Sequence, residues 1–331
     1  MSSKLCMKRL MVDRKRYAEL DSESLGIYCH FSDENMMNVK AMIIGPEETP
    51  YEGGFYFFDI NFNNQYPLVP PRVDFCSLNS NVRFNPNLYK GGKVCLSILG
   101  TWSGPGWTTA MNLITVLIDL QSLMNDNPIQ NEPGYEKRHW KKDEIAASYR
   151  TLVAYYNLTV AQFQMMDKTP PGFECFKEVM ERRFLRNDIF YKRWRDFMMP
   201  LEGQHFTNRY AGMGTVIHAN HWSSMIEDRL EQLHFKYPNW MEEKDAEVPA
   251  LGGGGAAEEK EEAAGNEDGK DTEAPDTKSV KAPKTNARKS PKEQAKLYEI
   301  GFTKTGEDGK LWVVKGYESG MRRWVRHKSG Q

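Results

Sequence analysis

The stretch GFYFFDINFNNQYPLVPPRVDF, residues 54–75, places an aromatic run directly before a proline-rich segment. The run at 54–62 has the composition typical of a strand. Prolines donate no backbone hydrogen bond to a sheet and disfavour a helix, so the chain from Tyr66 to Arg72 should be extended and lie at the surface. We therefore predict a strand, a rigid surface segment and then a short edge strand that starts at Arg72.

Two more strand-like runs precede this stretch, LGIYCHF at 25–31 and MNVKAMIIG at 37–45. The linking residues carry Gly-Pro, Thr-Pro and Gly-Gly pairs, which are the turn signals that an antiparallel meander needs. Apolar residues recur at helical spacing in further segments. The predicted helices cover residues 3–20, 110–124, about 143–166, 173–199 and 215–236. The predicted fold class is α+β: an N-terminal helix, a four-stranded antiparallel meander sheet and C-terminal helices with a helical extension.

Composition and charge argue against several classes of function. The 331 residues carry a formal net charge of -1, so nothing global indicates a nucleic-acid-binding or membrane-surface protein. The five cysteines are spread out without a C-x-x-C pair, which fits neither a disulfide framework nor a zinc site. We expect a soluble protein of a reducing compartment, cytoplasmic, nuclear or both, without a signal peptide or membrane span.

The composition changes beyond residue 241. Residues 242–276 hold thirteen acidic residues against three lysines, and the sign of the charge then reverses. Such segments bury too little apolar surface to offset chain entropy, and a basic run of this kind is more often solvated than bound to nucleic acid. The predicted domains are a core at 1–166, a helical extension at 167–241, a disordered acidic and then basic linker at 242–292, and a small β-rich module at 293–331.

One cysteine stands in a segment with the residues of a reactive site, FNPNLYKGGKVCLSILGTW at 84–102. Cys95 lies eight positions after Asn87, the last residue of an Asn-Pro-Asn motif. A side-chain amide held by turn residues is a neutral, directional donor suited to a developing oxyanion. A Cys-His hydrolase would need a distant imidazole, the nearest being His139. Alternatively, the cysteine only carries an acyl group, because thioester exchange needs a reachable thiolate rather than a strong base.

These landmarks together resemble the catalytic core of ubiquitin-conjugating enzymes. The resemblance is carried by GPEETPYEGGFYFFDINF at 45–62, YPLVPPRV at 66–73, the Asn-Pro-Asn motif with its cysteine, Trp107, and an apolar helix ending in Asn-Pro. It covers roughly residues 4–166. The chain is most similar to the large, extended members, which have asparagine in place of the first histidine of a His-Pro-Asn motif, a longer CLSILGTWSGPGW stretch, and an NEPG segment like that at 131–134.

The resemblance implies that Cys95 accepts the C-terminal glycine of ubiquitin from an activating enzyme as a thioester, which a substrate lysine then attacks. Asn87 would stabilise the oxyanion or order the active-site loop, while Asn85 and Pro86 would organise the turn. This chemistry calls for a solvent-reachable sulfur with the Asn87 amide close to it. The implied partners are ubiquitin, the activating enzyme, protein substrates and usually a ligase. The chain itself would need no metal or organic cofactor, because the activating enzyme consumes the ATP.

Further positions match loops of the same family. Near the acidic position of the gate loop the chain has Asn131 and Glu132, and a carboxylate there could orient or deprotonate the incoming lysine. Leu68, together with Thr108 and Thr109, matches the two loops that dock ligases. The family usually has a bulkier aromatic residue in place of Leu68 and Ser-Pro-Ala in place of Thr-Thr-Ala.

Two other functions compete with an active ubiquitin-conjugating enzyme. One is a non-catalytic ubiquitin-binding scaffold on the same fold, although such variants typically lack the cysteine that this chain keeps. The other is a conjugating enzyme for a different ubiquitin-like modifier. Charging with a panel of modifiers separates all three.

Overall fold

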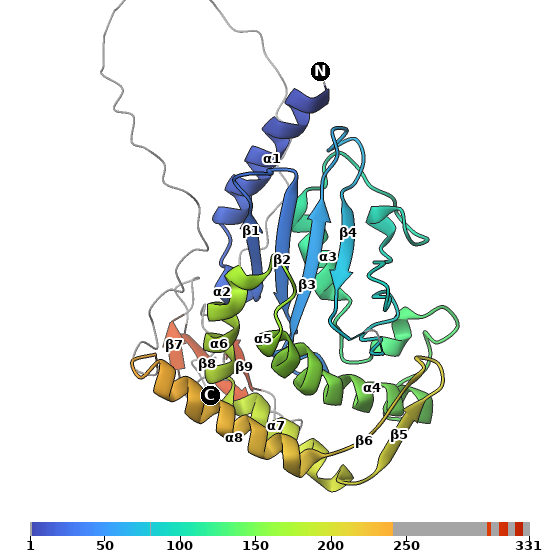
Figure 1. Cartoon of the computed structure of the whole chain (residues 1–331), viewed down its shortest axis with the longest axis vertical. Helices are drawn as coiled ribbons and strands as arrows, with labels where there is room; N and C mark the ends of the chain where they lie inside the picture. The colour runs from blue at the N-terminus through green and yellow to red at the C-terminus, as the bar shows by residue number, and fades with distance from the viewer. Residues whose placement is uncertain (1, 80, 241–302, 306–310, 317–321, 327–331) are drawn as a thin grey trace, which may run out of the picture. The chain divides into compact units, whose positions relative to one another are not determined.

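A computed structural model describes residues 2–79, 81–240, 303–305, 311–316 and 322–326. They belong to two compact units, Met1–Glu258 and Glu259–Gln331. The first unit holds an antiparallel sheet in the order β1-β2-β3-β4 (Figure 1). Its strands are β1 (Ile27–Phe31), β2 (Asn38–Ile44), β3 (Phe55–Asn61) and β4 (Arg72–Cys76). The predicted α+β class with a four-stranded meander is confirmed, and edge strand β4 starts where the prolines end.

The burial of β3 on both faces explains why the aromatic run shows no polar-apolar alternation. Successive side chains of a strand point to opposite faces of its sheet. Tyr56, Phe58 and Ile60 enter one hydrophobic cluster, whereas Phe55 and Phe57 enter a second one. Because helices cover both faces, nearly every position of the strand has to be apolar.

The first face of the sheet is covered by helices of the core. They are α1 (Ser2–Ala18), α3 (Leu113–Ser122) and part of α4 (Glu144–Tyr156). The Asn112 side chain accepts a hydrogen bond from the backbone N–H of Thr115 at 3.1 Å, which satisfies a free donor at the start of α3. The other short elements of the core are α2 (Ser22–Leu25) and the 3-10 turns Ser97–Leu99 and Pro128–Asn131.

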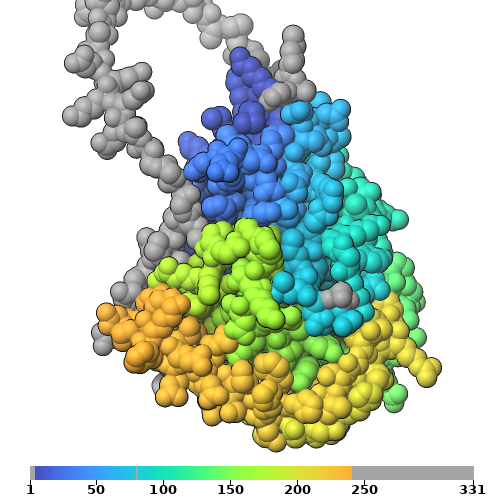
Figure 2. All heavy atoms as spheres, viewed as in Figure 1, coloured from blue at the N-terminus to red at the C-terminus, as the bar shows by residue number. Residues whose placement is uncertain are grey.

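The second face is packed against the segment after α4 (residues 157–240), which starts before the extension predicted at 167–241 and is called the extension from here on. Phe57 of β3 contacts Phe173 and Phe176, with ring centroids 5.0 and 6.2 Å apart. In Figure 2 the light-green atoms of the extension adjoin the blue atoms of the sheet. Its helical elements are a π-helical continuation of α4 (Asn157–Gln164), α5 (Met165–Asp167), α6 (Lys177–Leu185), α7 (Asp188–Met198) and α8 (Ala219–Lys236). The extension and the sheet therefore share one core.

Two predicted helices of the extension are wrong in detail. The segment 173–199 breaks between α6 and α7 at Arg186 and Asn187. The segment 215–236 begins inside a hairpin of β5 (His205–Asn208) and β6 (Met213–Val216), and α8 starts only at Ala219. Gly212 has φ +58°, a left-handed conformation that glycine adopts easily, so the chain turns back into a strand where the periodicity had suggested a helix.

A buried polar seam joins the extension to the core. The Asn157 Nδ2 donates to the Glu52 carbonyl at 2.8 Å, and the Tyr56 hydroxyl donates to the Asn157 Oδ1 at 2.6 Å. Arg193 of α7 pairs with the Glu52 carboxylate. A side chain at Gly54 would place its Cβ 1.9 Å from the Asn157 Oδ1, so only glycine fits this close approach.

The second unit is a three-stranded antiparallel sheet in the order β7-β8-β9. Its strands are β7 (Thr303–Thr305), β8 (Leu311–Gly316) and β9 (Arg322–Arg326). The linker predicted at 242–292 lies outside the described residues, as does much of the module predicted at 293–331. None of the described helices combines the length and apolar character that crossing a bilayer requires.

Candidate active site

Two hydrogen bonds join Cys95 and Asn87 across a tight loop. The Cys95 backbone N–H donates to the Asn87 carbonyl at 2.9 Å. In return, the Asn87 Nδ2 donates to the Cys95 carbonyl at 2.7 Å. The Asn87 backbone N–H donates to the Asn85 Oδ1 at 2.9 Å, a short-range bond typical of an Asx turn. The sequence spacing of eight residues thus closes a defined loop rather than a flexible one.

The Asn87 amide orders the loop in this conformation. Its Nδ2 is engaged by the Cys95 backbone carbonyl, so stabilising an oxyanion would require the amide to leave that carbonyl. Its Oδ1 is buried and has no hydrogen-bond partner among the described residues. Two roles were expected for Asn87, stabilising an oxyanion and ordering the loop. The hydrogen bond to the Cys95 carbonyl corresponds to the second role.

The expectation that Cys95 is reachable by solvent is wrong for this conformation, because the residue is only 1 % exposed. Burial raises the pKa of the Cys95 thiol above its ordinary value, while the positive charges of Lys93 and Arg83 and a hydrogen bond with Tyr89 act in the opposite direction. Burial therefore disfavours the thiolate of Cys95 in this conformation.

The chain has neither a disulfide nor a clustered metal site in its described parts. All five cysteines are free thiols. Within the described ranges, no three His, Cys, Asp or Glu side chains converge as metal ligands would.

Asn85 and Asn131 tie the Asn-Pro-Asn motif to the gate loop. The fully buried Asn85 donates through Nδ2 to the Leu123 carbonyl at 2.7 Å and to the Tyr51 hydroxyl at 2.9 Å. Asn131 donates to the Asn85 Oδ1 at 3.3 Å and to the same Leu123 carbonyl at 3.1 Å. The Pro86 carbonyl accepts a hydrogen bond from Arg83 at 2.8 Å. These predicted loop residues therefore do meet in one polar network.

Glu132 lies in a cluster that also contains Arg83, Tyr89 and Tyr210. Its Oε2 accepts the Tyr210 hydroxyl at 2.5 Å and lies 3.6 Å from the Arg83 guanidinium. The Arg83 guanidinium stacks between two rings, with its carbon 4.7 Å from the Tyr89 centroid and 5.1 Å from the Tyr210 centroid. Arg83 donates to the Pro86 carbonyl, and Glu132 follows Asn131, which donates to Asn85, so this cluster is tied to the Asn-Pro-Asn motif next to the cysteine.

Sequence reasoning missed Arg83, Tyr89 and Tyr210. Tyr89 could have been suspected, because it lies inside the segment that contains the cysteine. Tyr210 is 78 positions from Glu132 and sits in the turn of a hairpin that was not predicted, so no local signal pointed to it.

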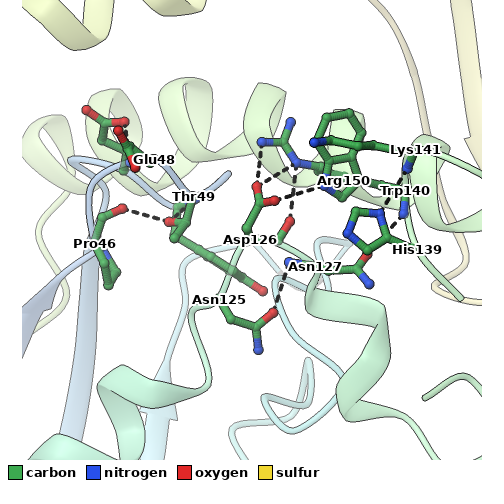
Figure 3. A network of polar contacts seen from close by, with 12 residues as sticks. Pro46, Glu48, Thr49, Asn125, Asp126, Asn127, His139, Trp140, Lys141 and Arg150 are labelled. Atoms are coloured by element: carbon green, nitrogen blue, oxygen red, sulfur yellow. Dashed lines mark hydrogen bonds and ion pairs between the residues drawn. The ribbon is translucent and has the colours of Figure 1, made fainter. Parts of the chain in front are cut away.

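The gate loop, which contains Glu132, lies between α3 and α4. A second polar network holds other residues of this loop (Figure 3). The Asp126 carboxylate accepts hydrogen bonds from the Arg150 Nη2 at 2.7 Å and from the Trp140 Nε1 at 2.9 Å. The Asn127 Nδ2 donates to the Arg138 carbonyl at 2.7 Å. The sequence NDNP, which ends the preceding helix, therefore also supplies the anchors of the loop that carries Glu132.

The predicted ligase-docking residues lie on two loops that one hydrogen bond joins. The Trp107 Nε1 donates to the Pro67 carbonyl at 2.8 Å. Leu68, on the first loop, is 63 % exposed, and Thr108 and Thr109, on the second, are exposed as well. The three side chains are thus available on neighbouring parts of the surface.

Comparison with known proteins finds a family match and several relatives for the core. Residues 9–156 match the family model described as ubiquitin-conjugating enzyme. The chain is 43 % identical over 171 residues to Ubiquitin-conjugating enzyme E2 Z of Homo sapiens, covering 51 % of this chain and 48 % of that protein. It is 39 % identical over 186 residues to the protein of that name from Xenopus tropicalis, covering 56 % of this chain and 59 % of that one.

A more distant relative is the Homo sapiens protein named Dual E2 ubiquitin-conjugating enzyme/E3 ubiquitin-protein ligase BIRC6. It is 36 % identical over 169 residues, which are 49 % of this chain and 4 % of that protein. The chain thus spans about half the length of the E2 Z relatives that it matches. Residues 9–156 of the chain thus match the ubiquitin-conjugating enzyme family.

Proposed function

We propose that this chain accepts ubiquitin as a thioester on Cys95 from an activating enzyme and transfers it to a lysine of a protein substrate, usually together with a ligase. The observation that supports this most directly is the position of Cys95. It is joined to Asn87 by hydrogen bonds in both directions, and the Asn-Pro-Asn motif is in turn bonded to Arg83 and to Asn131, the neighbour of Glu132.

In the first step, the Cys95 thiolate attacks the carbonyl carbon of the activating enzyme's thioester. A new carbon–sulfur bond forms, the old one breaks, and the activating enzyme's cysteine leaves as a thiolate. Lys93 and Arg83 favour the thiolate of Cys95, opposing the burial that raises its pKa. The chain then needs no metal or organic cofactor of its own, since ATP is consumed upstream.

In the second step, the substrate lysine loses a proton and its nitrogen attacks the thioester carbonyl. An isopeptide bond forms, and the carbon–sulfur bond breaks to release the Cys95 sulfur. The Glu132 side chain retains 24 % of its surface exposed, so it can orient the amine and accept the proton. For Asn87 to hold the oxyanion, its amide would have to swing from the Cys95 carbonyl.

The burial of Cys95 also favours a second function, that of a non-catalytic scaffold that binds ubiquitin. A cysteine that is 1 % exposed would not be charged unless the site opens. The two functions differ in whether a covalent adduct forms.

The deciding experiment incubates the chain with a ubiquitin-activating enzyme, ubiquitin and ATP and analyses the products on reducing and non-reducing gels. We expect an adduct that reductant removes. Cys95→Ser should give a reductant-resistant oxyester or no adduct, and Cys95→Ala should give none. Cys175→Ser, at a half-buried cysteine of the extension, serves as the matched control and should charge like the wild type.

A panel of ubiquitin-like modifiers and their activating enzymes belongs in the same experiment. Binding of ubiquitin without any adduct would support the scaffold. Charging only with another modifier would retain the enzyme but change its cargo. A reductant-sensitive adduct on Cys95→Ala would end the assignment of the nucleophile.

A further inference from the structure

The hairpin of β5 and β6 brings a residue of the extension into the candidate active site. Tyr210 lies in the turn between the two strands, and its hydroxyl donates to the Glu132 Oε2 at 2.5 Å. Burial, together with this hydrogen bond, raises the pKa of Tyr210 far above its ordinary range. The hydroxyl therefore stays protonated, and it is a permanent donor to the carboxylate.

The hairpin is fastened to the core away from Glu132. The Asn208 Nδ2 donates to the Ile145 carbonyl and to the Ser148 hydroxyl of α4, both at 2.9 Å. The Tyr156 hydroxyl donates to the Gly214 carbonyl of β6 at 3.0 Å. Both strands that flank the Tyr210 turn are thus hydrogen-bonded to α4. These bonds fix the position of the turn relative to the core.

The contacts of Glu132 leave one of its oxygens available. Tyr210 and Arg83 both engage Oε2, whereas Oε1 accepts no hydrogen bond within the described parts of the chain. The side chain as a whole is 24 % exposed, so part of it faces solvent. A carboxylate fixed through one oxygen presents the other in a defined direction, and a protonated primary amine is the group it would best receive.

We propose that Tyr210 is a positioning residue for the amine-transfer step, holding the Glu132 carboxylate so that Oε1 faces the lysine that attacks the Cys95 thioester. The inference rests on the proposed function. In that step Oε1 accepts a proton from the ammonium group, the nitrogen forms the isopeptide bond, and the Cys95 sulfur leaves. The extension thereby contributes to the active site itself.

The test uses the full-length chain charged with ubiquitin, and it follows single-turnover discharge to free lysine. Tyr210→Phe removes the hydroxyl and keeps the ring that stacks on Arg83. We expect normal charging and a discharge rate lower by about 3- to 10-fold, which corresponds to the net contribution of one typical hydrogen bond. Cleavage of the same thioester by dithiothreitol should be unchanged, because a thiol makes no use of Oε1.

Two further variants separate positioning from general structural damage. Tyr237→Phe deletes a hydrogen bond from a tyrosine hydroxyl to the Glu181 carboxylate in another part of the extension, without touching the hairpin or Glu132, and it should discharge within about twofold of the wild type. Glu132→Gln should slow lysine discharge strongly, and adding Tyr210→Phe to it should slow it little further, because the hydroxyl acts through the carboxylate.

The failures are distinguishable. If the wild type never charges, the proposed function fails before Tyr210 is tested. If the wild type charges but Tyr210→Phe discharges at the wild-type rate, Tyr210 does not position Glu132. Faster discharge would make the hairpin a barrier instead, and fully additive losses with Glu132→Gln would make Tyr210 merely structural; either result overturns the inference.

Discussion

The two faces of the meander sheet are buried to different extents and were unequally predictable. One face packs against helices of the core, and the other packs against the extension. Adjacent residues of β3 divide between them: Phe58 belongs to the core side and Phe57 to the extension side. The difference teaches that the extension is not an appendage, since without it the sheet would leave aromatic side chains uncovered.

The largest effects are expected when Phe57 and Phe58 are replaced by alanine one at a time, which tests both faces of the sheet. Phe57→Ala and Phe58→Ala each empty a fully buried site, so each should lower the free energy of unfolding by about 3–5 kcal/mol. Urea unfolding monitored by circular dichroism measures both, and we expect a single transition in each variant. If Phe57→Ala left the main transition unchanged and lowered only a minor one, the extension would fold as a separate domain.

A smaller effect is expected from the polar seam between the two regions. Asn157→Ala would leave the Tyr56 hydroxyl and the Glu52 carbonyl without their amide partner in the interior. We expect a loss of about 1–3 kcal/mol of unfolding free energy. Gln204→Ala, at an exposed residue of the extension, is the control and should melt within the error of the wild type. Equal melting temperatures for Asn157→Ala and wild type would show that the seam adds no net stability.

The smallest effect is expected from the charge of Lys93 on the pKa of Cys95. Because burial raises the pKa of Cys95, its alkylation by iodoacetamide at pH 7 should be slower than that of free cysteine and should rise toward alkaline pH as the thiolate forms. Lys93→Gln removes a charge that lowers this pKa, so it should shift the profile further toward alkaline pH.

We expect Lys93→Gln to slow alkylation at pH 7 by about two- to threefold, as for one solvent-exposed charge. Site-resolved mass spectrometry separates Cys95 from the other four cysteines, and Lys168→Gln is a distant charge control. A profile with its midpoint below that of free cysteine would contradict the closed conformation.

Much of the core followed from local pattern. Proline placement set the start of β4 at Arg72, and the aromatic run and its neighbours defined the meander. The spacing from Asn87 to Cys95 correctly singled out one loop, because turn residues act over a few positions. The hairpin of β5 and β6 escaped prediction because its strands are short and an apolar helix follows closely.

The sequence by itself determined the order of strands and helices in the core, the family of residues 9–156 and the identity of the cysteine to test. Those features depend on spacing within a few turns of chain. Only the tertiary structure decided that Cys95 is closed off, that Asn87 bonds to its backbone, and that Tyr210 reaches Glu132 from 78 positions away. The physical reason is that burial and long-range hydrogen bonds arise from packing between distant segments, which no local pattern encodes.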